Sequence, residues 1–514
     1  MGWSICLGRV PMQLVLDRQE RTPLHRQIAS QIRSLIEAGD LAVGIRLPAT
    51  RGLAQRLGVN RATVCTAYDT LVASGYLEAR VGQGTRVIRR GQDSNNAHAV
   101  LPAVGPDWSG LLAQTLDALV ADDDGPSEPE PLENGRIDFT GVIPDERFFP
   151  VDNLRRSLDT VLRREGETVL QYGSTRGYTP FRRVIAQRMR LAGNDVRADE
   201  ILVVNGAHQG LELFCRALLN PGDTVVVESP TYSNLLALLR LYRADIVSVP
   251  MTDGGLDLDE LERSVARRRP KFLYTMPHFQ NPTGVTTTLK HRKRLLEIAA
   301  RYDVPVLEDG FEEELRWDGG EVVSLRALET HGRVCYVGTF SKGLCPGFRI
   351  GWLVADSELC TRLALLKRTT DFHSSVLLQA ALAEFIQRGD YDRHLRRLRR
   401  VYRERMARTA TALEQHMPAG TRWRVPAGGY CVWLELPEGV SDDELVTRCA
   451  RDGVRLAPGR HFFIRDPGYG CVRLSISRVN DDDIDRGLAL VGRHLATLAH
   501  PARRAARADA RPYI

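Results

Sequence analysis

Apolar residues near the start of the chain recur at helical intervals in three stretches that turns separate. Two strand-like segments follow, joined by Gly82-Gln83-Gly84. This pattern predicts helix, helix, turn, helix and a two-stranded wing. The helical stretches are residues 23–38, 50–57 and 61–74, and the strand-like segments lie within 75–88.

The sequence also assigns caps and a core to these helices. Thr50 and Asn60 carry side chains that accept hydrogen bonds from a first helical turn, so both are predicted N-caps. Between the last two helices, Gly58-Val59-Asn60 is a tight turn. The third helix is expected to bury Val64, Ala67, Leu71 and Val72.

A helix-turn-helix places the N-terminal residues of its second helix in the major groove of DNA. Arg61 stands there with a side chain that can read guanine edges, and Thr63 and Arg51 are placed to hold phosphates. The glycine-rich wing tip can approach the backbone or minor groove, with Arg80 and Arg86 beside it. From these residues alone, the alternative to DNA binding is a small helical packing domain whose basic face is solvated.

Three motifs in this head are more specific than its element order. They are Leu47-Pro48-x-x-Arg51-x-Leu53-Ala54-x-x-Leu57-Gly58-Val59-x-Arg61-x-Thr63-Val64, Leu71-x-x-x-Gly75-Tyr76-Leu77 and Gly82-x-Gly84-Thr85. The head, residues 12–90, therefore resembles the winged helix of GntR-type bacterial repressors, with Asn60 in place of the usual serine. The DNA-binding residues implied are Arg51, Arg61, Thr63, Arg80, Gly82, Gly84, Thr85 and Arg86.

Charge separates this head from the residues that follow it. Residues 1–90 hold 13 arginines, no lysine and six acidic residues, whereas residues 91–135 hold nine acidic residues and no basic one. Only Trp108–Val120 has a helical apolar pattern within that acidic part. We therefore expect residues 91–135 to form a mobile linker with one short helix between two parts with separate roles.

Strand-like apolar runs alternate with helical patterns over residues 136–500. The alternation predicts an α/β fold with a mostly parallel sheet, in which ligands bind beyond the carboxyl ends of the strands. The predicted strands are Ile201–Val204, Thr224–Val227, Ile246–Val249, Phe272–Thr275, Val304–Leu307, Val334–Val337 and Ile350–Val354.

The stretch 337–352 joins a strand end to hydroxyl groups, a lysine and an arginine. Thr339 and Ser341 precede Lys342, and Arg349 follows it by seven residues, which suits an anion pocket. A lysine amine can also condense with an aldehyde, and a guanidinium cannot. Of the five lysines, only Lys342 stands among apolar, glycine and hydroxyl residues. On this stretch alone, a solvated loop lysine remains the alternative.

Other polar groups follow the predicted strands in a fixed order. They are Gly206-Ala207-His208-Gln209 at a helix start, Tyr232, Asn281-Pro282-Thr283-Gly284 and Asp309. Each alone is equally typical of a turn, a cap or a core residue. In this order with Lys342, they resemble the fold-type-I aminotransferases, and the resemblance covers nearly all of residues 136–500.

That resemblance implies a site for pyridoxal 5′-phosphate (PLP) and a small C-terminal α/β domain over about 395–500. Lys342 would form the Schiff base, and Asp309 would pair with the pyridine nitrogen and keep the ring protonated. Asn281 would bond the ring hydroxyl, Tyr232 would stack on the ring, and Arg473 would clamp a substrate carboxylate. The phosphate ligands implied are Ala207, His208, Thr339, Ser341, Arg349 and, from a neighbouring subunit, Tyr172.

One position departs from the aminotransferase pattern. These enzymes commonly have a tyrosine shortly after the aspartate, whereas Phe311 stands at the nearest position here. The missing hydroxyl puts efficient transamination in doubt, although a weak activity or a half-reaction remains open.

A GntR-type head joined to an aminotransferase-like domain resembles the MocR family of regulators, the GabR and PdxR type. The leading hypothesis is a regulator that binds a double-stranded DNA operator as a homodimer. It would sense PLP, an amino acid or an amine through aldimine exchange at Lys342. The alternatives are a broad-specificity aminotransferase with a vestigial head and a repressor whose large domain only dimerises.

The composition indicates the cellular compartment in which this chain is expected. It has no apolar run of about 18 residues and no basic start followed by a long apolar region, so neither membrane span nor signal peptide is expected. Met12 is an alternative start. The nine scattered cysteines include no Cys-x-x-Cys pair, which indicates reduced thiols in a cytoplasm and no metal site.

Overall fold

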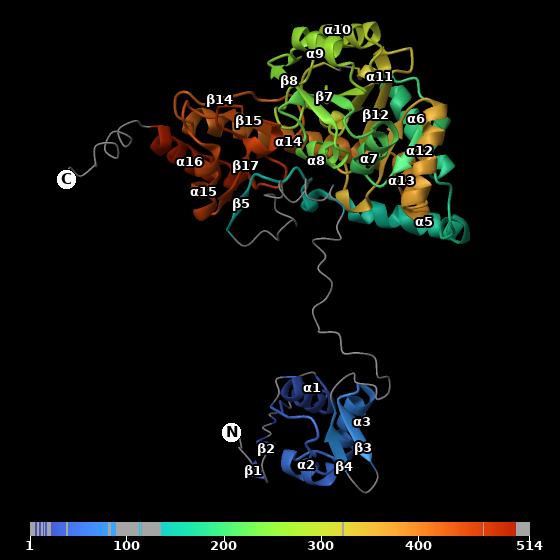
Figure 1. Ribbon diagram of the computed structural model, residues 1–514, viewed down its shortest axis with the longest axis vertical. Helices are drawn as coiled ribbons and strands as arrows, with labels where there is room; N and C mark the ends of the chain where they lie inside the picture. The colour runs from blue at the N-terminus through green and yellow to red at the C-terminus, as the bar shows by residue number, and fades with distance from the viewer. Residues whose placement is uncertain are drawn as a thin grey trace, which may run out of the picture. The chain divides into compact units, whose positions relative to one another are not determined.

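The computed structural model divides the chain into two compact units, one within Met1–Asp107 and one within Trp108–Ile514 (Figure 1). The predicted helix at Trp108–Val120 and the rest of the acidic linker lie outside the described residues, apart from three single positions. The described residues are 22–37, 40–80, 84–88, 135–320, 323–465 and 467–499, with isolated positions before residue 22 and within the linker.

The first unit has the predicted winged helix-turn-helix fold. Its third helix follows its second through Gly58, which adopts the left-handed conformation (φ 62°) that ends the second helix. The two wing strands pair antiparallel, and residues 6–7 and 10–11 form a second small pair. Its elements are β1 (Cys6–Leu7), β2 (Val10–Pro11), α1 (Leu24–Glu37), α2 (Thr50–Leu57), α3 (Arg61–Ala73), β3 (Leu77–Arg80) and β4 (Gly84–Val87).

Two local expectations for this unit are wrong. Thr50 is the first residue of α2 and not its cap, since Ala49 occupies that position without a side-chain bond. Val72 is 37% exposed, because it lies one residue beyond the buried Leu71 and so faces a neighbouring side of α3. The Asn60 cap is confirmed, as its side chain accepts a bond of 2.9 Å from the backbone of Ala62.

An eight-stranded sheet forms the centre of the second unit. Its strand order is β6-β13-β12-β11-β10-β7-β8-β9. The five central strands β12 to β8 run parallel, and β13 and β9 run antiparallel to their neighbours. Its strands are β6 (Ile201–Val204), β7 (Thr224–Ser229), β8 (Asp245–Thr252), β9 (Gly255–Leu256), β10 (Phe272–Thr275), β11 (Val306–Asp309), β12 (Val334–Thr339) and β13 (Gly351–Val354).

Helices cover both faces of this sheet, as the apolar clusters show (Figure 1). The helices α7, α8 and α12 pack on one face, and α6, α13, α9 and α10 contribute to the clusters on the other. The helices are α5 (Val151–Val169), α6 (Thr179–Leu191), α7 (Ala207–Leu218), α8 (Ser233–Leu241), α9 (Leu258–Arg268), α10 (Leu289–Arg301), α11 (Leu325–Leu328), α12 (Ser357–Thr370) and α13 (Val376–Gln387).

A smaller α/β lobe follows the long helix α14 (Asp390–His416), which is about 40 Å long. Its four-stranded antiparallel sheet has the order β14-β15-β18-β17. One strand from the start of this unit, β5 (Ile137–Asp138), pairs in parallel with β16 of the lobe. Its elements are β14 (Arg422–Trp423), β15 (Cys431–Glu435), α15 (Asp442–Arg451), β16 (Val454–Arg455), β17 (Ala457–Pro458), β18 (Cys471–Ser475) and α16 (Asp481–Ala499).

Candidate functional site

The carboxyl end of β11 carries a buried carboxylate with two donors. Asp309 accepts a hydrogen bond of 2.8 Å from the hydroxyl of Tyr274, at the end of the neighbouring β10, and one of 3.1 Å from the backbone of Phe311. Burial nevertheless raises the pKa of Asp309 to about 6. The site therefore holds a carboxyl that gains stability as an anion when a cation approaches it.

Replacing Asp309 with asparagine is expected to stabilise the cofactor-free protein. The unfolded chain, with an ordinary pKa of 3.8, loses this proton more readily than the folded chain, so folding is penalised as pH rises from about 4 to 6. Asp309→Asn should therefore raise the free energy of unfolding by about 3 kcal/mol at pH 7 and by almost nothing near pH 4. Urea denaturation at the two pH values measures this difference.

The exposed Asp318, in the loop after the same strand, provides the matched control. Asp318→Asn should leave the urea midpoint unchanged at both pH values. An equal gain for Asp309→Asn at pH 4 and pH 7 would contradict the prediction, because removal of a charge cannot then be the cause.

Lys342 lies beyond the end of β12, close to Asp309. Its ammonium donates a hydrogen bond to the carbonyl of Val142, and its own carbonyl accepts one of 2.7 Å from the Tyr430 hydroxyl. Burial lowers the pKa of Lys342, and the charges of Glu312 and Asp309 oppose this shift. A lysine whose neutral form is favoured in this way is better suited to act as a nucleophile.

The N-terminus of α7 forms a cradle suited to an anion. Its cap residue Gly206 has φ 84° and no side chain, so the helix start at Ala207 and His208 is not capped by a side-chain group. A Cβ at Gly206 would stand 2.8 Å from the Arg349 guanidinium, which donates to the carbonyl of Asn205. The fold therefore brings Arg349 to this helix start.

The hydroxyl groups before Lys342 are buried next to each other. Thr339 donates to the Ser341 hydroxyl over 3.0 Å and accepts from the Ser341 backbone over 3.1 Å. A Cβ at Gly351 would stand 2.9 Å from the Ala207 nitrogen and 2.8 Å from the Gly338 carbonyl, so the ends of β12, β13 and α7 meet there. Thr339, Ser341, Arg349 and Ala207 thus come from neighbouring strand and helix ends.

A buried polar network holds the cradle from behind. Lys367, fully buried on α12, forms an ion pair of 2.6 Å with Asp371 and donates to Gln209 over 3.1 Å. Asp371 also accepts bonds from Asn205 and Gln209. The network fixes residues on both sides of Gly206, and no motif in the sequence pointed to it.

Arg473 on β18 links the small lobe to the site. Its guanidinium donates to Asn281 Oδ1 over 2.9 Å and to the carbonyl of Thr140, and it lies 4.8 Å from the centre of the Phe462 ring. Asn281 and Arg473 are therefore in contact, as a joint role toward one ligand requires.

The two predicted tyrosines differ in their surroundings. Burial and the charge of Asp309 raise the pKa of Tyr232, while Arg473 and Arg349 act in the opposite direction, so Tyr232 lies among three other predicted site residues. Tyr172 is 88% exposed and contacts the ring of His373 edge-on at 5.7 Å. Tyr172 is thus not part of the site within its own chain.

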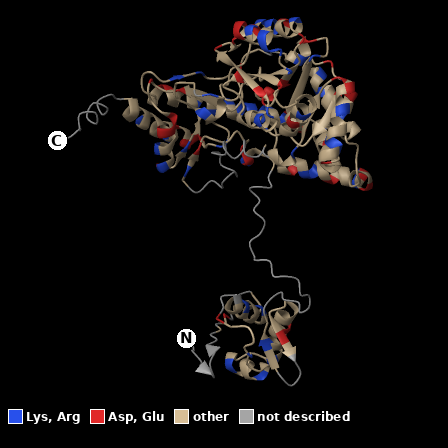
Figure 2. Cartoon of the chain, in the orientation of Figure 1, with Lys and Arg blue, Asp and Glu red and all other residues tan. Residues whose placement is uncertain are grey.

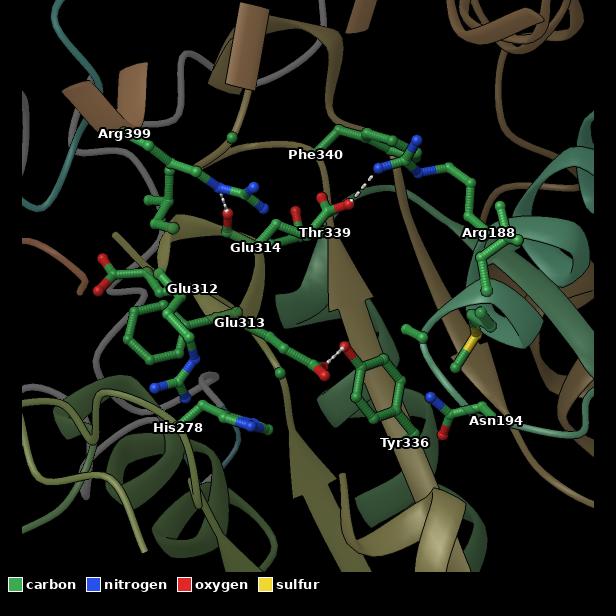
Figure 3. A pocket seen from close by; sticks show the side chains of 18 of the residues that line it. Arg188, Asn194, His278, Glu312, Glu313, Glu314, Tyr336, Thr339, Phe340 and Arg399 are labelled. Carbon is green, nitrogen blue, oxygen red and sulfur yellow. Dashed lines mark hydrogen bonds and ion pairs between the residues drawn. The ribbon is translucent and has the colours of Figure 1, made fainter. Parts of the chain in front are cut away.

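A cavity of about 520 Å³ lies beside this site, lined by residues 310–319 and by α6, β12 and α14 (Figure 3). Phe311 lines it and packs against two apolar clusters. Glu312 and Glu313 turn their carboxylates apart: Glu313 accepts from Tyr336 over 2.7 Å, and Glu312 points away from that pair (Figure 3).

Sequence reasoning missed several residues of the site. Tyr274 and Glu312 lie beside the predicted Asp309 and Lys342, and Tyr430 anchors the Lys342 backbone. Glu228, at the end of β7, is buried with three donors, and burial raises its pKa to about 7. Two of these residues could have been found from their positions in the sequence, because Tyr274 and Glu228 stand at the ends of predicted strands, where ligands bind.

The predicted DNA-binding residues lie on α3, which is the recognition helix, on α2 and on the wing. Figure 2 shows basic positions on the helices of this unit. Arg51, Arg61 and Arg86 are exposed, and Thr63 and Thr85 are partly so. Gly84 has φ 85°, and a Cβ there would stand 2.6 Å from Arg46. Gly82 and the side chain of Arg80 lie outside the described residues.

Comparison with known proteins identifies both units. Residues 141–491 match the family "Aminotransferase class I and II", and residues 24–87 match "Bacterial regulatory proteins, gntR family". The "Probable rhizopine catabolism regulatory protein MocR" of Rhizobium meliloti is 32% identical over 466 residues, which cover 89% of this chain and 91% of that protein. The chain belongs to the MocR-type transcriptional regulators.

Relatives of this MocR-type chain also include enzymes that match its large unit. The "Aromatic-amino-acid aminotransferase 1" of Thermococcus litoralis is 36% identical over 358 residues, 68% of this chain and 86% of that protein. The structure of LysN, the α-aminoadipate aminotransferase of Thermus thermophilus complexed with N-(5′-phosphopyridoxyl)-L-leucine, has a TM-score of 0.70 at 33% identity. That match covers 76% of this chain and 99% of LysN.

The cofactor of the MocR-type large domain is PLP, and the residues present fit it. The buried Asp309 carboxyl gains a cationic partner if a pyridinium lies beside it, and the side-chain-free helix start at Gly206 suits a phosphate. PLP supplies an aldehyde, which can bond to an amine, and an electron-withdrawing ring.

Among the described residues, no helix is long and apolar enough to cross a membrane.

Proposed function

We propose that this regulator senses PLP or an amino compound at Lys342 and changes its affinity for an operator in response. The observation that carries the proposal is that Lys342, Asp309 and Arg473 meet in one site beneath a segment that follows the linker in sequence. The first test is the absorbance spectrum of the pure protein during addition of PLP and then of single amino acids and amines. A spectrum that no added amine alters would contradict the proposal.

That segment, residues 139–145, is held by the site's own cations. Lys342 donates to the Val142 carbonyl, and Arg473 donates to the Thr140 carbonyl. Asp145 at its end is buried and forms an ion pair of 2.8 Å with Arg405 on α14. A covalent bond at Lys342, or a carboxylate on Arg473, would therefore compete with contacts that hold the start of the large unit.

We further propose a homodimer in which Tyr172 reaches the site of the other subunit. Its ring is 88% exposed and contacts His373; Leu170, two residues before it, is 68% exposed, and Phe372, the residue before His373, is 66% exposed. A cluster of this kind is unusual on a monomer surface and is suited to burial against a second copy. Sedimentation of the protein with and without substitutions in this cluster tests the dimer.

The second candidate function is amino transfer by the same site. It is supported by the set of Lys342, Asp309, Asn281 and Arg473, in which Arg473 contacts Asn281 and Tyr274 contacts Asp309, although Phe311 lacks the hydroxyl that these enzymes commonly have. Turnover of about 1–1,000 per second with an amino acid and an oxo acid would support it. Much slower turnover, together with a spectral response to amines, supports the sensor.

Arg61→Ala is expected to weaken binding to the natural operator by about 1–3 kcal/mol, because a bidentate contact to a base is lost. Arg61 is exposed at the first position of α3, next to the Asn60 cap, where a recognition helix enters the major groove. Gel-shift titration of operator and unrelated DNA measures the effect. Unchanged operator affinity would disprove this groove assignment.

Arg86→Ala provides the contrasting variant. Arg86 is exposed on β4 of the wing, so we expect it to contact phosphate and not bases. Its loss should weaken binding to all DNA about equally and should reduce the slope of affinity against salt concentration.

A further inference from the structure

Four carboxylates stand at or just beyond the ends of β7 and β11, and three of them already have partners. Asp309 accepts from Tyr274 and Phe311, Glu313 accepts from Tyr336, and Glu228 accepts from three donors. Glu312 differs from them. Its Oε1 is the only buried carboxylate oxygen among the described residues that has no hydrogen-bond partner, although its side chain is only 2% exposed.

Tyr430 fixes Glu312 relative to Lys342. The Tyr430 backbone donates to Glu312 Oε2 over 3.1 Å, and the Tyr430 hydroxyl donates to the Lys342 carbonyl over 2.7 Å. A Cβ at Gly429 would stand 2.5 Å from the same Glu312 oxygen, so the glycine leaves room for this carboxylate. The residue just before β15 thus holds both the carboxylate and the lysine backbone.

The charges of the two side chains act on each other. Burial raises the pKa of Glu312 to about 7, and Lys342 is the largest opposing influence. Burial lowers the pKa of Lys342, and Glu312 is again the largest opposing influence. Arg473 and Asp309 act on both groups, and no ion pair within 4.0 Å joins Lys342 to a described carboxylate. Each of the two groups therefore favours the charged form of the other.

We propose that Glu312 is the general acid–base group of this site, which takes a proton from Lys342 and returns it as the lysine bonds to the cofactor aldehyde. The proposal rests on the proposed function, since it assigns the proton transfers of the bond at Lys342. Asp309 is less suited to this task, because both its oxygens have donors and it is expected to face the pyridine nitrogen.

The proton and bond changes balance without another reactant. Glu312 first accepts a proton from the Lys342 ammonium, which leaves an amine with a free electron pair. The nitrogen then bonds to the aldehyde carbon as the C=O double bond opens, and one nitrogen-bound hydrogen moves to the oxygen. The oxygen leaves as water with the proton that Glu312 returns, and a protonated C=N bond remains. No electron is transferred to or from an outside reagent.

The test is the rate of C=N bond formation after cofactor-free protein is mixed with PLP, followed by stopped-flow absorbance over a pH series. Glu312→Gln keeps the size of the side chain but cannot exchange a proton. We expect it to slow bond formation by about 10²–10⁴-fold at pH 7, the usual contribution of a general acid–base group. The wild-type profile should have an inflection near pH 7, since the pKa of Glu312 is about 7, and the variant should lack it.

Glu313→Gln is the matched control, because Glu313 is the next carboxylate in the chain and faces Tyr336. It should bond PLP within about twofold of the wild-type rate. Glu312→Ala tests the role in a second way, since added formate should restore its rate in proportion to concentration.

Three results would each overturn the inference. They are a Glu312→Gln rate equal to that of the wild type, a slowed Glu312→Gln reaction that keeps the wild-type inflection, and a Glu312→Ala rate that formate leaves unchanged. A wild type that forms no C=N bond with PLP would overturn the proposed function and this inference together. A wild type that forms the bond, with Glu312→Gln equally fast, would overturn only the inference.

Discussion

Borohydride reduction of the PLP-loaded protein should fix the cofactor on Lys342 and on no other lysine of the chain. Lys342 directly follows the buried hydroxyl pair of Thr339 and Ser341 in the chain, the charge of Asp309 acts on it, and burial lowers its pKa. A neutral amine in that position can bond to an aldehyde, whereas an ammonium cannot. Peptide mapping of the reduced protein identifies the labelled residue.

Lys367 is an internal control for this result. It is fully buried and lies behind the same helix start, but Asp371 holds its ammonium at 2.6 Å. The remaining lysines, at positions 271, 290 and 293, are exposed. Lys342→Ala should lose all covalent label, while PLP retains some affinity through Asp309 and the phosphate groups. Labelling of Lys367, or of several lysines equally, would contradict the assignment.

Effector binding should change operator affinity by about 5–150-fold, the usual range for coupling between two sites. A ligand shifts an equilibrium only through a difference in affinity for the two states. An amino compound at Lys342 would place a carboxylate near Arg473, whose guanidinium now contacts Thr140 and Asn281. Operator titration with and without PLP and each candidate compound measures the change.

The response should disappear in Lys342→Ala and in Arg473→Ala, while DNA binding without ligand persists in at least the second variant. Arg422→Ala is a suitable control, since this arginine is 81% exposed on β14 of the same sheet and pairs with Glu435. It should respond like the wild type. If wild-type operator affinity ignores PLP and every compound that alters the spectrum, the large unit is not a sensor and amino transfer becomes the better explanation.

Periodicity was sufficient to locate most elements, because burial of one face dictates where apolar residues stand. All seven predicted strands occur, although the strand predicted at Val304–Leu307 is Val306–Asp309. This difference matters for the site, since it makes Asp309 the last residue of β11. The two predicted caps likewise show that the ends of elements are harder to predict than the elements themselves. Asn60 caps α3, whereas Thr50 already lies inside α2.

The site was predictable only in part, because contacts between distant segments are not encoded in local spacing. Lys342, Asp309 and Arg473 were identified from motifs, and the fold brings them together. No motif indicated Tyr274 and Glu312. The direction of the Tyr274 side chain depends on how β10 pairs with β11, and that of Glu312 depends on where Tyr430 lies. The carbonyls of Thr140 and Val142 have no sequence signal at all, since every residue carries such a group.

The pairing of β5 with β16 has a practical consequence for dividing the chain. Phe139, directly after β5, is fully buried, and it receives a backbone bond from Ser475 on β18 and makes one to Arg455. A truncated protein that began after residue 145 would lose this strand, this aromatic side chain and the carbonyls that contact Lys342 and Arg473. A stand-alone cofactor-binding fragment, or a hybrid with another DNA-binding head, should therefore be joined before Ile137.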